Sequence, residues 1–567
     1  MSLADPVTTE IIRNAFVSIA KDMNAALIRS AFTPVIYEGK DCSVALLDET
    51  GEVLGQSLGL PLFLGNLEIC VKIMAEKYGW EYFHEGDVFY MNDSYIAGTH
   101  LNDATIIMPI FWKGERIGFA ASRAHWLDVG AKDPGTPVDA HEIYQEGMRW
   151  GPTRLYEGGK PREDVIELLR LNSRFGDATV GDMNAQVAAG RTGERRMQAL
   201  FDRFGWDTIR AARDEIFRQT QERERKEVGQ IPDGEYSASG FLDDDGLGSD
   251  KIPVEVKITV SGEQISVDLS ESGDQASGPV NCGITQTIAA VRVAYKLLIC
   301  TDEAPNGGSF KPLKVEAPDG TIFSAVEPAP CGWYFSPLGL LIDLFITAFS
   351  PALPGRVAAA HYGDSMVIDN QFYLMIEPTT GGWGAFKGGD GQSSLINNVN
   401  GSFKDLPVEV VENKYPITVK SYGIRKDSGG AGEFRGGNGT FREYEICSDS
   451  SLSLWFERSK TPGWGLFGGQ CGRVPNVKVR SPDGKKADYL KLNSLSVAEG
   501  AIIFSETGGG GGYGDPLDRD PESVRLDVID GYTSVEAARS SYGVVVTENL
   551  LVSTEKTDQL RQAMRQS

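Results

Sequence analysis

The sequence predicts a mixed α/β protein with several lobes, and three observations lead to this fold class. The chain has 567 residues, more than one hydrophobic core usually supports, so we expect about two to four lobes. Helical and strand-like patterns alternate along the first part, whereas the last part has short strands and glycine-rich loops. These changes predict an N-terminal α/β region, a central mixed region, a β-rich region of glycine loops and a helical tail, over 1–228, 229–412, 413–520 and 521–567.

The first elements follow from capping residues and apolar spacing. Asp5 followed by Pro6 is typical of a helix start, and apolar residues over 10–32 recur at helical spacing. This pattern predicts a long amphipathic helix. Segment 42–54 predicts two strands joined by a turn, and 66–79 predicts a second helix that ends at a glycine.

Three further strands are predicted over 87–93, 104–114 and 116–125. His100 should therefore lie in the loop between two strands, and His125 at the end of the third. Because the ends of adjacent strands lie side by side, two histidines that are 25 residues apart can meet here without strain.

Later elements are marked by changes of period. Helical spacing dominates three segments between 162 and 228. Alternation over 251–270 then predicts strands, and 286–300 predicts a helix. A region punctuated by proline and glycine follows, to about residue 360.

Composition limits the classes of partner. The net charge is −24 and the isoelectric point is about 4.8, which argues against nucleic acid and anionic membranes because both need clustered Lys and Arg. The longest apolar stretch, 338–349, is too short to span a bilayer and contains Asp343. The N-terminus lacks the features of a signal peptide, and the seven cysteines form no CxxC pair. We therefore expect a cytoplasmic protein with reduced thiols.

Two of the five histidines, His100 and His125, lie in the segment of predicted strands. His100 lies three residues before Asp103, and His125 follows at a strand end. Imidazole and carboxylate together suit a divalent metal such as Zn, Mn or Fe, with positions left open for water or substrate. Asp41 precedes an apolar strand, where a carboxylate has no obvious structural task, and is a further candidate ligand. The alternative is a pair of core histidines satisfied by hydrogen bonds.

A second acidic cluster follows His125 closely. Glu142 and Glu146 are four residues apart and would share one face of a helix. Paired carboxylates of this kind could supply a general base and support the metal ligands. The alternative is a solvated helix face. His84 and His361 are expected to be structural.

Two glycine-containing motifs are not expected to carry their usual chemistry. GQSLG matches the G-x-S-x-G pattern, but Pro61 follows too soon for the required strand–turn–helix, so Ser57 is discounted as a nucleophile. Gly508–Gly512 lacks the Lys-Ser/Thr of a phosphate-binding loop, and no GxxxxGK[ST] occurs in the chain. These glycines are expected to serve turns and close backbone packing, at a tight interface or near substrate. If the system uses ATP, another chain is expected to bind it.

Longer motifs run in order along nearly the whole chain, to about residue 520. They include VIYEGKDCSVALLD, GDVFYMNDSYIAGTHLND, SRAHWLDVGAKDPG, EIYQEGMRWGPTRLYEGG, NSRFGDATVGDMNAQVAAGRTGERR, RKDSGGAGEFRGGNG and GGGGGYGDP. Together they resemble the hydantoinase B/5-oxoprolinase B family. The resemblance implies a subunit of an ATP-dependent heteromeric enzyme, such as N-methylhydantoinase, 5-oxoprolinase, caprolactamase, or acetone or acetophenone carboxylase. It also implies a partner subunit of the hydantoinase-A type that binds ATP.

The resemblance also bears on the site. It implies a metal bound by His100, Asp103 and His125. Asp41, which precedes the first predicted strand, matches an acidic position that neighbours the metal site in the family. Two residues depart from the family's pattern: many members have an aromatic residue in place of Cys42, and many hydrolases have a second histidine in place of Trp126. These departures leave the reaction subtype open.

Three hypotheses about function follow from the resemblance. In the first, the partner phosphorylates the oxygen of a cyclic amide such as a hydantoin or lactam, because the unactivated carbonyl is resonance-stabilised. The metal then polarises this species or supplies hydroxide, and Asp41 or Glu146 takes the proton from water. In the second, an enol phosphate made from a ketone attacks CO2 near the metal. In the third, the chain is a non-catalytic scaffold. In every case we expect a hetero-oligomer.

Overall fold

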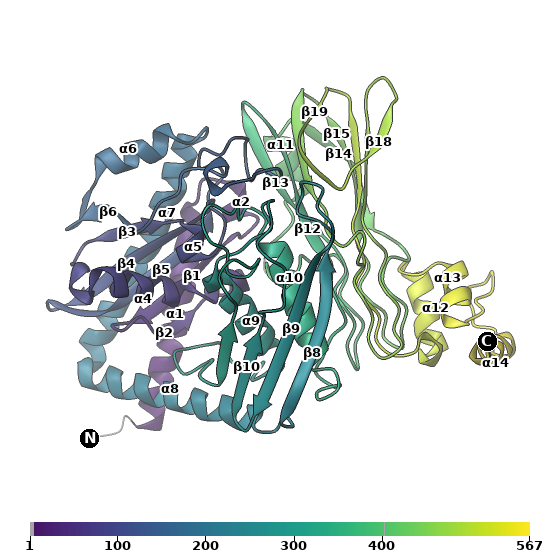
Figure 1. The fold of residues 1–567 in the computed structure, drawn as a ribbon, viewed down its shortest axis with the longest axis horizontal. Coiled ribbons are helices and arrows are strands. Elements are labelled where there is room, and N and C mark those ends of the chain that lie inside the picture. The colour runs from purple at the N-terminus through teal and green to yellow at the C-terminus, as the bar shows by residue number, and fades with distance from the viewer. Residues whose placement is uncertain (1–4, 402, 567) are drawn as a thin grey trace.

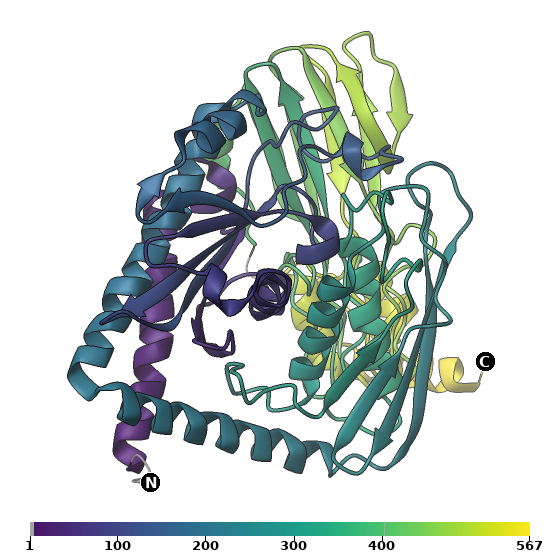
Figure 2. The same cartoon turned by 60° about the vertical axis from the view of Figure 1, so that its left-hand side comes forward.

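The computed structural model describes residues 5–401 and 403–566 and has the mixed α/β fold that the sequence predicts (Figures 1 and 2). The described strands form four sheets, of seven, four, four and five strands. No helix within these ranges is long and apolar enough to cross a membrane. Figure 1 shows the N-terminal region, the central sheet, the later sheets and the tail following one another across the molecule.

The N-terminal region contains the seven-stranded sheet. Its strands, in spatial order, are β2 (Val53–Gln56), β1 (Cys42–Asp48), β5 (Glu115–His125), β4 (Asp103–Trp112), β3 (Val88–Met91), β6 (Thr153–Glu157) and β7 (Lys160–Pro161). Neighbouring strands are antiparallel throughout. The β4–β5 hairpin turns at Lys113 and Gly114, which both have positive φ as a two-residue hairpin turn requires. The predicted turn is confirmed.

Helices cover both faces of this sheet because its central strands are apolar on both sides. In β1, Val44 and Leu46 join the core beneath α1, whereas Ala45 and Leu47 join the core beneath α4. The long helices are α1 (Pro6–Ser30), α4 (Leu67–Tyr78), α7 (Gly176–Phe204) and α8 (Trp206–Val228). The shorter ones are α2 (Pro34–Tyr37), α3 (Pro61–Leu64), α5 (Ser94–Ala97), α6 (Glu163–Leu171), η1 (Trp80–Tyr82) and η2 (Ile143–Gln145). As predicted, the Asp5 side chain caps α1.

The central sheet begins just after α8. Its spatial order is β11 (Leu313–Glu316), β10 (Gln264–Asp268), β9 (Ile252–Ser261) and β8 (Gly234–Leu242), with α9 (Ile284–Leu298) and α10 (Phe335–Ala348) packed nearby. Helix α10 lies against β8, β9 and α9. The sequence pattern indicated only a proline- and glycine-punctuated region here. Because α10 is buried almost all round, it has no polar face that would mark a helical period.

Two further sheets complete the body. One has the order β13 (Tyr373–Thr380), β12 (Gly363–Asn370), β16 (Ser450–Trp455) and β19 (Lys491–Val497). The other has the order β14 (Ile417–Ile424), β15 (Thr440–Ile446), β20 (Ile502–Glu506), β17 (Asn476–Arg480) and β18 (Lys486–Asp488), with α11 (Val408–Lys414) before it. Because β12 pairs with β16, one sheet combines strands from both sides of the expected boundary between 412 and 413.

The glycine-rich loops form a bundle of extended segments. Gly508–Gly512 lie at its centre, and three segments surround them: 382–385, 428–437 and 463–473. The amides of Gly509 and Gly512, three residues apart, both donate to the 463–473 segment, and the carbonyls of Gly508 and Gly511 both accept from the 382–385 segment. A three-residue repeat is that of a polyproline II helix. The close backbone packing predicted for these glycines therefore occurs within the chain.

The C-terminal tail is helical and lies at the end of the molecule remote from the N-terminal sheet (Figure 1). Its elements are η3 (Pro516–Asp518), α12 (Pro521–Ile529), α13 (Val535–Tyr542) and α14 (Thr554–Gln566). A small core that includes Val524, Ala538 and Tyr542 joins the tail to Ala431 in the glycine bundle.

Candidate metal centre

The seven-stranded sheet brings three of the predicted site residues to one edge. Asp103 is the first residue of β4 and His125 the last of β5, and the antiparallel register pairs them directly. Asp41 precedes β1 on the other side of β5, and its carbonyl accepts the amide hydrogen of His125 at 3.1 Å. Residues that are far apart in the sequence meet here because three neighbouring strands begin or end at the same edge.

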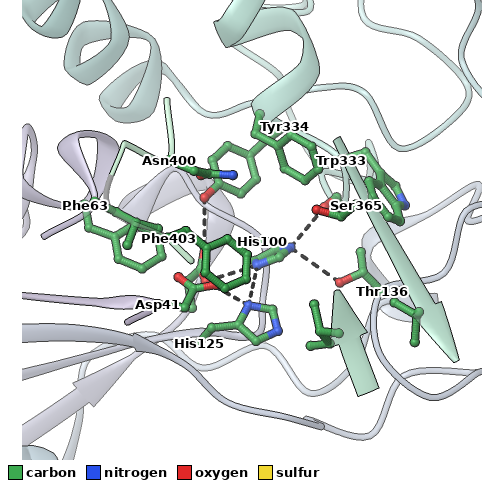
Figure 3. Close-up of a pocket in the computed structure, with 16 residues that line it drawn as sticks. Asp41, Phe63, His100, His125, Thr136, Trp333, Tyr334, Ser365, Asn400 and Phe403 are labelled. Atoms are coloured by element: carbon green, nitrogen blue, oxygen red, sulfur yellow. Dashed lines mark hydrogen bonds and ion pairs between the residues drawn. The ribbon is translucent and has the colours of Figure 1, made fainter. Parts of the chain in front are cut away.

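His100 reaches the same edge from the turn between α5 and β4. Its carbonyl accepts the amide hydrogen of Asp103 at 3.1 Å, which closes the turn. His100 Nε2 then lies 3.0 Å from Asp103 Oδ1 and 3.0 Å from His125 Nδ1. His125 Nδ1 lies 3.3 Å from the same carboxylate oxygen. Figure 3 shows the two imidazoles gathered with Asp41 at one side of the cavity.

The spacing of these atoms fits a shared divalent ion. His100 Nε2, His125 Nδ1 and Asp103 Oδ1 all lie within 4.8 Å of one another. Ligand atoms bound tetrahedrally to one ion at roughly 2.1 Å stand about 3.4 Å apart, close to the spacing seen here. Two nitrogens and one oxygen suit Zn, Mn or Fe, and a site with three protein ligands retains an open position.

The tautomer of His100 is set by its second nitrogen. Nδ1 lies 3.0 Å from the carbonyl oxygen of Gly332, to which it can only donate. A neutral His100 therefore carries its lone pair on Nε2, the atom that faces Asp103 and His125. A histidine held in this way by a backbone carbonyl is typical of a metal ligand.

The ionised carboxylate of Asp103 dominates the electrostatics of this buried cluster. Burial would raise the pKa of Asp103, but the two imidazoles outweigh it and hold the pKa below its usual value. Burial opposes protonation of His100, yet Asp103 raises its pKa overall, whereas burial lowers the pKa of His125. The arrangement favours an ionised carboxylate between two nitrogens, which is the state that binds a divalent ion.

Asp41 faces the same cavity without being part of the close group of three. It is buried, and its Oδ1 has no hydrogen-bond partner among the described residues. Burial raises the pKa of its carboxyl well above the usual value, and the charge of Asp103 adds to this effect. An unpaired buried carboxylate is unfavourable unless a cation, a proton or water satisfies it. Asp41 is therefore suited to hold a proton or to approach an ion.

Glu146 lies behind His100 and does not line the cavity. Its two carboxylate oxygens accept the amide hydrogens of Cys331 at 3.0 Å and Gly332 at 2.7 Å. Burial raises the pKa of Glu146 to about 8. The predicted helical pairing with Glu142 does not occur, because only the three residues of η2 are helical here and Glu142 is exposed. Glu146 thus fixes the backbone whose carbonyl orients His100.

The sequence patterns did not reveal Tyr334. Its hydroxyl donates to Asp103 Oδ2 at 3.0 Å, so the carboxylate is held from the side opposite the histidines. Tyr334 and Gly332 come from the segment that leads into α10, about 230 residues from the hairpin. The aromatic run Trp333–Phe335 was the available signal, but a run of this kind is more often part of a core.

The centre lies at one end of a small cavity between the N-terminal sheet, the start of α10 and the β12–β13 hairpin (Figure 3). The volume is about 50 Å³. The lining residues are Asp41, Leu60, Phe63, His100, Asp103, His125, Thr136, Gly332, Trp333, Tyr334, Phe335, Ser365, Val367, Ile376, Asn400 and Phe403. A few polar groups in a mostly apolar wall are typical of a small-molecule site.

The remaining candidates lie outside this cavity. His361 is buried and its Nδ1 lies 2.8 Å from Asp343 Oδ1, as in a structural histidine, and His84 is largely exposed beside Asp87. The Ser57 hydroxyl donates to the carbonyl of Leu58 at 3.2 Å, and α3 begins only at Pro61. These contacts agree with structural roles for His361 and Ser57.

The fold and this centre define a member of the hydantoinase B/oxoprolinase family, and the chain belongs to it: the family's model matches residues 5–516. The chain is 30% identical to the B component of a putative D-/L-hydantoinase from Pseudomonas sp. (strain NS671), over 98% of both chains. It is 32% identical to the beta chain of the caprolactamase from Pseudomonas jessenii, over 97% of both chains. It is 28% identical to a 5-oxoprolinase of Dictyostelium discoideum, covering 90% of this chain but 40% of that protein.

Solved structures agree with this assignment. The crystal structure of the ATP-dependent caprolactamase from Pseudomonas jessenii superposes with a TM-score of 0.88 at 31% identity, covering 98% of this chain and 99% of that one. A nucleotide-free acetone carboxylase also has a TM-score of 0.88, at 19% identity, covering 99% and 83%. This second likeness concerns the fold alone. The family predicted from the sequence motifs is confirmed.

Proposed function

We propose that this chain is the metal-dependent catalytic subunit of an ATP-dependent hydrolase of cyclic amides, such as hydantoins or lactams. The observation that carries the proposal is the group of His100, Asp103 and His125, whose ligand atoms converge at one end of a small cavity. Hydantoinase, caprolactamase and 5-oxoprolinase relatives support the reaction class.

ATP is assigned to a partner subunit. The chain has no GxxxxGK[ST] motif, and its glycine-rich loops are filled by backbone packing. The hydantoinase and caprolactamase relatives of this length are each named as one subunit of an enzyme, whereas the 5-oxoprolinase relative is more than twice as long. We therefore propose a hetero-oligomer in which a hydantoinase-A-type subunit phosphorylates the amide oxygen.

The chain's own residues would then complete the hydrolysis. A divalent ion held by His100, Asp103 and His125 would polarise the activated group and lower the pKa of a water molecule. Gly332 and Tyr334 keep two of these ligands in position, through hydrogen bonds to His100 and Asp103. The small cavity would limit the access of bulk water to a labile phosphorylated species.

Asp41 is proposed as the group that moves the proton. Its raised pKa and unpaired oxygen allow it to accept a proton from the attacking water and to return it to the ring nitrogen. Attack at the activated carbon and cleavage of the carbon–nitrogen bond give an acyl phosphate, and a second water releases phosphate and the open-chain acid. One cyclic amide, one ATP and two waters thus give one open-chain acid, ADP and phosphate.

A ketone carboxylase is the second candidate, and the fold shared with an acetone carboxylase is compatible with it. There the phosphorylated species would be an enol phosphate that attacks CO2. Both candidates use the same metal centre, so the substrate and the need for bicarbonate distinguish them.

The test is a metal analysis and an ATPase screen of the chain purified with its partner. The proposal expects about one divalent ion per chain and ATP turnover with cyclic amides in the absence of bicarbonate. Turnover that needs a ketone and bicarbonate would establish the carboxylase. If the metal content is negligible and His100→Ala retains full activity, the chain is a scaffold and the proposal is wrong.

A further inference from the structure

We infer that the substrate bound in this cavity is an uncharged ring, and that a ring bearing a free carboxylate is rejected. The inference rests on the proposed function and narrows its substrate class, because the relatives of this chain include a 5-oxoprolinase, whose substrate bears a carboxylate. It concerns the part of the substrate that faces the wall, away from His100 and His125.

The charge of the lining carries the argument. Among the sixteen described residues that line the cavity there is no Lys or Arg, and the two ionisable acids are Asp41 and Asp103. A divalent ion at the centre would be offset by Asp103 and by the phosphate of the activated ring, whether or not Asp41 carries a proton. A carboxylate on the substrate would then be buried without a counter-charge, which is strongly unfavourable.

Basic side chains that adjoin the lining residues do not line the cavity themselves: Lys404 follows Phe403 in the chain but is exposed, and two others are committed elsewhere. Arg123 is fully buried and donates to Thr105, Asn66 and Cys70, with its guanidinium on the Phe63 ring that itself lines the cavity. Lys40, next to Asp41 in the chain, donates to the carbonyl of Tyr37. Neither is among the residues that line the cavity, so neither can pair with a bound anion without breaking these contacts.

The wall opposite the centre is suited to an uncharged ring. Its apolar side chains come from four separate segments and are Phe63, Phe335, Val367, Ile376 and Phe403. Ser365 and Asn400 add a hydroxyl and a carboxamide, and no hydrogen bond joins either side-chain group to another described residue. A carboxamide can both donate to and accept from the amide of a lactam or hydantoin, so these two groups can orient such a ring without adding charge.

The test compares three substrates that differ only at one ring position. These are 2-pyrrolidinone, 5-oxoproline and the primary amide of 5-oxoproline, which has nearly the bulk of the carboxylate without its charge. Initial rates of ATP-dependent ring opening are measured with the complex of this chain and its partner subunit. We expect kcat/KM for the carboxylate to be at least about 100-fold below that for its amide.

Each outcome decides one question. Equal or faster turnover of 5-oxoproline than of its amide would overturn the inference and leave the proposed hydrolase intact. Turnover of 2-pyrrolidinone alone would also overturn it, because size and not charge would then set the limit. If no cyclic amide is opened, the proposed function fails, and titration calorimetry of the metal-loaded complex decides the inference by comparing binding of the amide and the carboxylate. Tighter binding of the carboxylate would then refute it.

Discussion

The metal centre and the glycine bundle use the chain in opposite ways. At the centre, an ordinary antiparallel hairpin positions particular side chains, and the backbone could carry many others. In the bundle, Gly508–Gly512 contribute no side chains, and their backbone is itself the packed surface. The centre depends on which side chains are present, whereas the bundle depends on the absence of side chains.

Distances make this contrast quantitative. The ligand atoms of the centre lie 3.0–3.3 Å apart, leaving space for an ion among them. A Cβ added at Gly509 would stand 1.8 Å from the carbonyl oxygen of Ser428, and one at Gly510 would stand 2.1 Å from that of Trp383. Non-bonded atoms do not approach so closely, so the bundle has no space for even one methyl group. A substitution should therefore affect chemistry in one region and folding in the other.

The largest expected effect is a loss of activity at the centre. Asp103→Asn preserves the shape of the side chain but removes the charge that faces both histidines. We expect metal binding to be lost and ATP-dependent ring opening to fall at least about 1,000-fold, while the melting temperature of the metal-free protein stays the same or rises. Elemental analysis, activity of the complex and thermal melting measure the three. Asp177→Asn, at an exposed side chain, is the control. Retained metal with normal activity would contradict the assignment.

The converse effect is expected in the bundle. Gly510→Ala places a methyl group against the Trp383 carbonyl and should lower the free energy of unfolding by about 3 kcal/mol or more. Gly355→Ala is the matched control, because a Cβ there meets nothing within 4 Å, and it should change stability by less than about 0.5 kcal/mol. Urea unfolding of both variants gives the comparison. If the two glycines tolerate alanine equally, the bundle is not held by backbone contact.

The proximity of the candidate metal ligands could be predicted from the sequence better than their surroundings, for a physical reason. A hairpin is local, so the strand patterns and the Lys113–Gly114 turn were enough to align Asp103 with His125. His100 and Asp103 lie in one short turn, so their proximity could also be predicted from the local sequence. The close backbone packing of the bundle was also predicted, because successive glycines have few structural roles other than turns and close packing. Its partner segments were not, since they lie up to about 130 residues away.

The parts that could not be predicted depend on long-range contacts. Tyr334 meets Asp103 only after the central region folds back on the N-terminal sheet. Glu146 was considered, beside Asp41, as a group that could take the proton from water. Its contacts with the backbone amides of Cys331 and Gly332 are long-range and could not be predicted from the local sequence. The pairing of β12 with β16, across the expected boundary between 412 and 413, was equally out of reach because it leaves no trace in local composition.

Removal of the metal should separate the two regions in one experiment. An ion that binds only the folded protein stabilises it by about 2.7 kcal/mol when its concentration is 100 times its dissociation constant. Chelation should therefore lower the stability of the wild type and of Gly510→Ala equally, and leave Asp103→Asn unchanged. Differential scanning calorimetry with and without chelator gives the three differences. A loss of stability in Asp103→Asn as large as in the wild type would mean that the ion binds elsewhere.

The smallest predicted effect concerns Glu146, which acts on the centre only through the backbone. Glu146→Gln leaves one oxygen for the two amides of Cys331 and Gly332 and turns an NH2 group toward the other. The Gly332 carbonyl should then hold His100 less firmly, and metal affinity should fall roughly 10- to 100-fold, which competition with a chelating dye measures. Glu157→Gln, at an exposed side chain, is the control and should not change it. Unchanged affinity combined with loss of activity in Glu146→Gln would instead favour a direct part in proton transfer, and Glu146 would then join Asp41 as a catalytic group.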